Sequence, residues 1–132
     1  MSVESQELLD LNQRLLDAIA QGDWAVYEKL CDPALTAFEP EGQGQLIEGL
    51  EFHRFYFRLG GARGPNHTTM AAPNVRLMGD VALVTCVRLN QRIGADGQAA
   101  VTAFEETRVW HKQAGDWRHV HFHRSKVPRN HE

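Results

Sequence analysis

The N-terminal part of the chain alternates apolar and polar residues at the spacing of amphipathic helices. Leu11 and Leu15 belong to a series that recurs every three or four positions, which predicts a helix over about residues 3–20. Asp23 can cap a second, short helix, and Pro33 ends it because the residue before a proline is pushed out of the helical region. The chain therefore begins with one long and one short helix.

Beyond these helices the pattern changes to the period-two alternation of strands. Strands are predicted over residues 36–38, 45–47, 67–72, 74–78, 81–93, 99–112 and 117–125. Helical spacing returns only over residues 48–58. The pattern predicts an α+β fold, in which a long N-terminal helix and two shorter ones cover one face of a curved antiparallel sheet and make a cone.

Composition and charge narrow the possible functions. At 132 residues the chain is expected to form a single domain over residues 1–132, with a flexible tail over 126–132. A net charge of -3 without a basic stripe argues against nucleic-acid binding. The absence of a long apolar run or a signal-like N-terminus argues against a membrane location, so we expect a cytoplasmic protein. Cys31 and Cys86, in apolar surroundings, are expected to be buried and reduced.

Three arginines share strand faces with apolar and aromatic side chains: Arg88, Arg108 and Arg124. Because a guanidinium stays charged, such arginines must either pair internally or bind an anion. The carboxylates that we consider for internal pairing are Glu39, Glu105 and Glu106. From spacing alone both alternatives stay open.

The opposite faces of the last two strands carry side chains suited to a contact between two copies of the chain. Strict alternation places there Thr107, Val109, Trp117, His119, His121 and His123. The three histidines among them could share a zinc ion, but no cysteine or carboxylate completes the set. We therefore predict a homodimer interface and no metal.

Seven segments in one order resemble the association (hub) domain of calcium/calmodulin-dependent protein kinase II, which has the nuclear transport factor 2-like fold. They include the sequences Phe-His-Arg-Phe-Tyr-Phe and Glu-Glu-Thr-Arg-Val-Trp-His. The segments are 31–33, 36–40, 48–57, 67–69, 77–80, 105–111 and 120–125. The resemblance extends over about residues 5–126, so it involves nearly the whole chain.

The resemblance implies a domain without kinase chemistry that dimerises through its sheet, builds rings, and holds an arginine-lined cavity for small carboxylates. Carried over by position, the cavity residues are His53, Arg88, Arg108 and Arg124. Tyr56 is expected at the wall of the same cavity. The resemblance thus implies a non-catalytic oligomerisation domain that binds itself and a small carboxylate or other anion, without a cofactor.

Two departures from the family pattern qualify this expectation. The chain has no Gly-rich nucleotide loop, His-Arg-Asp or Asp-Phe-Gly sequence, so we expect a free-standing, bacterial version that cannot phosphorylate. The loop after Phe57 is short and carries Gly60 and Gly61 where the family has an aromatic gate residue. This difference argues against a gated cavity and against ring assembly.

A catalytic function is the alternative, because other members of the fold are isomerases, dehydratases or hydrolases. His53 or Glu39 could act as the base and Tyr56 as the hydrogen-bond donor, acting on a carboxylate substrate. The fold alone does not decide between binding and catalysis.

Overall fold

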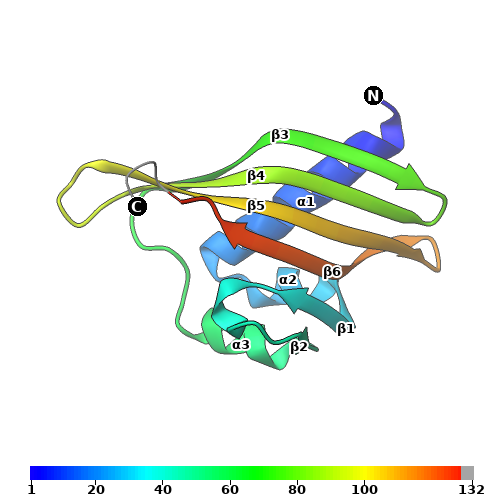
Figure 1. Cartoon of the computed structure of the whole chain (residues 1–132), viewed down its shortest axis with the longest axis horizontal. Coiled ribbons are helices and arrows are strands. Elements are labelled where there is room, and N and C mark those ends of the chain that lie inside the picture. The colour runs from blue at the N-terminus through cyan, green and yellow to red at the C-terminus, as the bar shows by residue number, and fades with distance from the viewer. Residues whose placement is uncertain (129–132) are drawn as a thin grey trace.

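The computed structural model describes residues 1–128 and has the predicted α+β architecture. Its helices are α1 (Val3–Gln21), α2 (Trp24–Leu30), the 3-10 helix η1 (Pro40–Gly42) and α3 (Glu51–Arg58). Its strands are β1 (Cys31–Phe38), β2 (Ile47–Glu48), β3 (Asn66–Met78), β4 (Val81–Ile93), β5 (Ala99–Gln113) and β6 (Asp116–Lys126). They form one six-stranded sheet in the order β2-β1-β6-β5-β4-β3. Figure 1 shows the sheet with the long helix α1 behind it.

Most neighbouring strands are antiparallel, as predicted, but β1 and β6 run parallel. The two predicted strands 67–72 and 74–78 are one strand, β3, because pairing with β4 resumes after an irregularity between Ala71 and Asn74. There Ala72 has a φ of 49° and Pro73 has no N–H to offer to the ladder. The bulge lets the strand bend without ending.

The sheet also extends further towards the C-terminus than expected. Lys126 pairs with Phe104, and the Val127 N–H donates to the Ala103 carbonyl at 2.9 Å. Residues 126 and 127, at the start of the predicted flexible tail over 126–132, therefore continue the pairing with β5. Residues 129–132 of that predicted tail lie outside the described residues.

The sheet has an inner face that packs on helices. Its core centres on α1, whose Asn12 accepts a 3.1 Å hydrogen bond from the indole Nε1–H of the fully buried Trp110. The other large, fully buried apolar and aromatic side chains are Leu8, Leu15, Leu16, Tyr27, Leu35 and Val84. Within residues 1–128, no helix is long and apolar enough to cross a membrane.

The loop after α3 is fastened to the end of α1. The Ala62 N–H donates to the Ala20 carbonyl at 2.8 Å, and a Cβ on Gly61 would lie 2.3 Å from the carbonyl carbon of Gln21. Only glycine allows this close approach of two backbones. The loop therefore has a fixed position beside the C-terminal end of α1.

A bulge in β6 changes which side chains face inwards. Val109 pairs with His121 and the next residue, Trp110, pairs with His119, so Val120 is an extra residue on β6. Strict alternation breaks at this position. Trp117 and His119 consequently lie on the inner face, where they are 5% and 0% exposed. The prediction that these two side chains face outwards is wrong.

Candidate functional site

A cavity of about 190 Å³ lies between the inner face of the sheet and helices α1, α2 and α3. It is lined by Ile19, Tyr27, Glu39, Glu41, His53, Tyr56, Phe57, Arg88, Arg108, Phe122 and Arg124. The structure thus brings together all five residues predicted to bind a ligand, together with Glu39. Strands β4, β5 and β6 each contribute one arginine, because the three positions share the inward face.

Two of these arginines share one buried carboxylate. Glu106 receives a 3.0 Å hydrogen bond from Arg108 Nε and another of 3.0 Å from Arg88 Nη1. Burial alone would raise the pKa of Glu106, but the charges of Arg108 and Arg88 hold it below its ordinary value. Internal pairing, one of the two expected alternatives, therefore occurs here. Glu105, also considered as a partner, is exposed and belongs to the opposite face.

The third arginine, Arg124, contacts two carboxylates. Its Nη2 lies 3.3 Å from a Glu39 oxygen and 2.6 Å from a Glu41 oxygen. Glu41 lies in η1, and its side chain is 36% exposed, whereas that of Glu39 is 7% exposed. Sequence reasoning missed Glu41. Its position two residues after Glu39 in the Glu-Pro-Glu turn could have identified Glu41 as a second carboxylate near the arginines.

Helix α3 supplies the aromatic and imidazole wall. His53 Nε2 lies 2.6 Å from Glu39 Oε2, and the ring is almost fully buried. Burial would raise the pKa of Glu39, but the His53 hydrogen bond and the charges of His53 and Arg124 hold it below its ordinary value. Tyr56 is 40% exposed at the edge of the cavity. Glu39 therefore stays ionised in a fixed position.

His119 lies beneath the cavity rather than on a surface. Its Nε2 is 3.4 Å from Arg108 Nη1, its Nδ1 is 3.5 Å from Cys31 Sγ, and its ring stacks on Phe122. Burial and the charge of Arg108 hold the pKa of His119 well below its ordinary value. Burial also raises the pKa of Cys31 to about 12, which makes the thiol unreactive. His119 is therefore a neutral structural residue.

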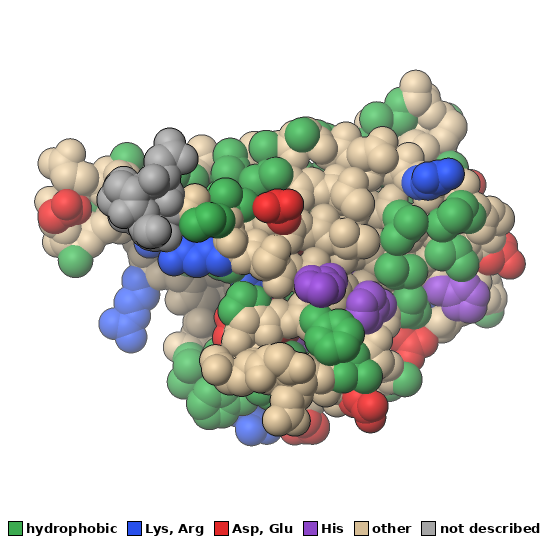
Figure 2. Space-filling model, viewed as in Figure 1, with side chains coloured by type: hydrophobic (Ala, Val, Ile, Leu, Met, Phe, Trp, Pro, Cys, Tyr) green, Lys and Arg blue, Asp and Glu red, His purple; other side chains and the backbone are tan. Residues whose placement is uncertain are grey.

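The outer face keeps the other four residues predicted for an interface: Thr107, Val109, His121 and His123. His121 Nδ1 lies 2.7 Å from Thr36 Oγ1, and both imidazoles contact the ring of Phe38. Figure 2 shows two neighbouring histidines beside a hydrophobic side chain on this face. Because His119 faces inwards, the three histidines cannot share one ion, and residues 1–128 contain no cluster of three metal-ligating side chains.

Comparisons with known proteins agree with the resemblance seen in the sequence. The family model of the calcium/calmodulin dependent protein kinase II association domain matches residues 4–128. The delta subunit of this kinase from Oryctolagus cuniculus is 45% identical over 131 residues. That alignment includes 97% of this chain but 25% of the rabbit protein, so the chain spans about a quarter of its length.

Solved structures give the same result. The association domain of the C. elegans kinase is 47% identical, with a TM-score of 0.87 over 92% of this chain and 95% of that one. The hub homology domain from Chlamydomonas reinhardtii is 46% identical, with a TM-score of 0.87 over 95% of this chain and 99% of that one. A nuclear transport factor 2-like protein from Salmonella enterica, 23% identical with a TM-score of 0.76, shares the fold. This chain belongs to the calcium/calmodulin-dependent protein kinase II association domain family.

Proposed function

We propose that this chain assembles with copies of itself through the outer face of its sheet and binds a small carboxylate in the inner cavity without catalysing a reaction. Membership of the association domain family over residues 4–128 is the observation that carries the proposal. We place the assembly in the cytoplasm because both cysteines are free and buried, as expected in a reducing compartment.

The outer face supports the assembly half of the proposal. Its centre consists of uncharged, half-buried side chains, including Leu83, Thr85, Thr107 and Val109, on strands β4 and β5. In Figure 2 few charged side chains lie over the middle of the sheet. A depletion of charge around apolar residues is typical of the centre of a protein interface. A two-fold dimer would pair this surface with itself.

Light scattering of the purified chain tests the assembly. We expect at least a dimer at micromolar concentration. Thr107→Arg places like charges opposite each other in a two-fold contact, so this variant should become monomeric while it stays folded. Gln98→Arg, in an exposed turn, is the matched control and should leave the mass unchanged. A monomeric parent protein would contradict the proposal.

The cavity supports the binding half. A guanidinium has five N–H donors, so Arg88 can bind a carboxylate in addition to the contacts that it already makes, and Arg124 can bind one in exchange for Glu41. The volume of about 190 Å³ suits a ligand of a few heavy atoms. Because Glu41 occupies Arg124 Nη2, an incoming carboxylate has to replace Glu41 there. Partial exposure of Glu41 makes this exchange feasible.

A thermal-shift measurement with sodium acetate and butyrate against equal sodium chloride tests the cavity. Ligand at about a hundredfold over its dissociation constant adds about 2.7 kcal/mol, which raises Tm by several degrees. Arg124→Gln should remove the shift. Arg108→Ala is a poorer test because it leaves Glu106 buried with one partner fewer. A shift that persists in Arg124→Gln would place the binding site elsewhere.

The geometry favours binding over catalysis. A general base is most effective when its pKa lies near the working pH, whereas the pKa of Glu39 is lowered further by His53 and Arg124. Glu39 is also held between these two side chains, at 2.6 Å and 3.3 Å. A carboxylate fixed in this way positions an arginine and a histidine rather than accepting a proton from a substrate.

A further inference from the structure

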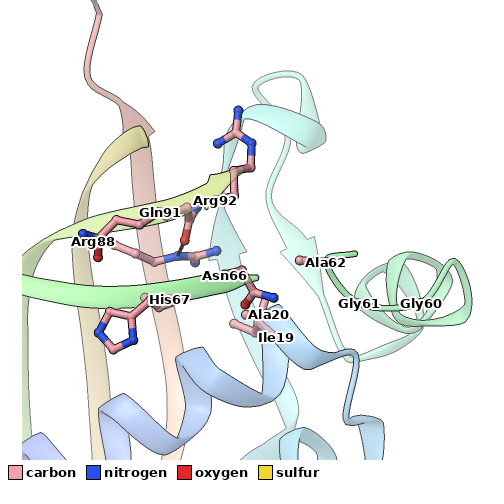
Figure 3. A pocket seen from close by; sticks show the side chains of 12 residues that line it. Ile19, Ala20, Gly60, Gly61, Ala62, Asn66, His67, Arg88, Gln91 and Arg92 are labelled. Atoms are coloured by element: carbon pink, nitrogen blue, oxygen red, sulfur yellow. Dashed lines mark hydrogen bonds between the residues drawn. The ribbon is translucent and has the colours of Figure 1, made fainter. Parts of the chain in front are cut away.

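A second hollow, of about 290 Å³, opens beside the arginine cavity. Figure 3 shows its three walls: the end of α1 with Ile19 and Ala20, the loop with Gly60, Gly61 and Ala62, and the paired ends of β3 and β4. The strands contribute Asn66, His67, Thr68, Arg88, Asn90, Gln91 and Arg92 to the lining. A Cβ on Gly60 would meet no atom within 4 Å, so this side of the hollow is open.

The lining of this hollow is cationic and amide-rich. It contains two arginines, a histidine and three amide side chains, and none of its lining residues is a carboxylate. Arg92 donates from Nη1 to Thr102 Oγ1 at 2.9 Å and has no carboxylate within 4.0 Å among residues 1–128. Arg92 is exposed at the rim of the hollow, so its guanidinium is accessible to a ligand.

Both hollows are lined by Ile19 and Arg88, so they meet at these two side chains. Arg88 reaches between them and uses Nε for Asn90, at 3.1 Å, and Nη1 for Glu106, at 3.0 Å. Arg92 lies four residues further along β4 on the same inward face, about 13 Å away along the strand. The combined space is long, with an arginine at each end and one in the middle.

Counting charges defines what this space can hold. Four arginines, at positions 88, 92, 108 and 124, meet three carboxylates, at positions 39, 41 and 106. Among these arginines and carboxylates, with His53 left out of the count, the excess is one positive charge. If Glu41 moves into solvent, from a position where its side chain is already 36% exposed, the excess becomes two. The space then matches a dianion.

We propose that the two hollows together bind an elongated dicarboxylate. One carboxylate replaces Glu41 on Arg124, and the other binds at Arg92 on the exposed rim of the second hollow. This inference rests on the proposed carboxylate-binding function and adds to it a second anchoring end and a length requirement. Glu41 is then a built-in competitor that occupies Arg124 in the empty protein.

Calorimetric titration of dodecanedioate against dodecanoate tests the second end, because the two ligands share a chain long enough to extend from Arg124 towards Arg92 and differ by one carboxylate. A charged hydrogen bond contributes enough for about a tenfold or larger change in affinity, so dodecanedioate should bind at least tenfold more tightly. Arg92→Gln should reduce dodecanedioate affinity to that of dodecanoate and leave dodecanoate unaffected. Arg63→Gln, an exposed arginine on the neighbouring loop, is the matched control and should change neither affinity.

Glu41→Gln tests the exchange on Arg124. Removal of the competing charge should strengthen binding of both ligands several-fold, and unchanged affinities would refute the exchange. Equal affinities for dodecanedioate and dodecanoate, with no effect of Arg92→Gln, would overturn the second anchoring end while leaving the proposed carboxylate site in place. Binding of neither ligand would overturn the carboxylate site and this inference with it.

Discussion

The two faces of the sheet are built from the same strands yet have opposite chemistry. The inner face buries Arg88, Arg108 and Glu106 as well as large aromatic rings. The outer face carries threonine, valine and histidine side chains that no described helix covers. These residues alternate along each strand with the residues of the inner face. Within residues 1–128, charged side chains are thus buried only on the inner face, where the fold holds each of them next to an oppositely charged side chain. The outer face, whose centre at Leu83, Thr85, Thr107 and Val109 is uncharged, is the one that can meet another copy of the chain at low desolvation cost.

Removal of the shared carboxylate on the inner face should have the largest effect on stability. Glu106→Gln leaves the charges of Arg88 and Arg108 buried without a compensating charge, which should cost about 3–5 kcal/mol of unfolding free energy. Urea unfolding followed by circular dichroism measures the change. Glu105→Gln is the matched control on the exposed face, where substitutions usually change stability by less than about 0.5 kcal/mol. If both variants lost the same unfolding free energy, burial on the inner face would not make a carboxylate more important for stability than exposure on the outer face.

The histidines of the two faces should differ in their contribution to the pH dependence of stability. The folded-state pKa of His119 lies well below 6.5, so below pH 6.5 the unfolded chain takes up a proton that the folded chain does not. Stability should therefore fall as the pH decreases from 6.5 towards that lower pKa, by up to about 1.4 kcal/mol per pH unit.

Urea midpoints between pH 7 and pH 5 in His119→Gln should show a flatter slope than the parent protein. On the outer face, burial and the charge of His123 also lower the pKa of His121, but this ring is partly exposed. His121→Gln should accordingly flatten the slope by a smaller amount. An unchanged slope in His119→Gln would show that this histidine binds its proton equally well in the folded and unfolded chains.

The assignment of most side chains to the inner or outer face of the sheet could be predicted from the sequence, because alternation along a strand is a local property. Strand β4 begins and ends at the predicted residues, and its Arg88 faces inwards as expected. The faces of Trp117 and His119 could not be predicted, because one inserted residue, Val120, reverses the alternation and only the pairing with β5 reveals it. A bulge depends on contacts between strands rather than on local spacing.

The residues of the inner cavity could likewise be predicted only in part. The inward arginines and His53 were accessible from parity and from the family resemblance. Alternation also placed Glu106, and not Glu105, on the face of Arg108. That Arg88 shares this carboxylate could not be predicted, because their contact depends on the register of β4 with β5. Glu41 was missed because a turn fixes its position, and turn geometry leaves no period in the sequence.

The smallest effect is expected for a side chain at the centre of the outer face. Val109 is half-buried within one chain, so Val109→Ala should cost less than about 1 kcal/mol in dilute protein. Association stabilises the folded state by mass action, so the Tm of the parent protein should rise with protein concentration. If Val109 contributes to the contact between copies, the variant should show a smaller rise, measurable by scanning calorimetry over a concentration series. A parent Tm independent of concentration would mean that the outer face meets only solvent, and that the contrast between the faces reflects the burial of charge alone.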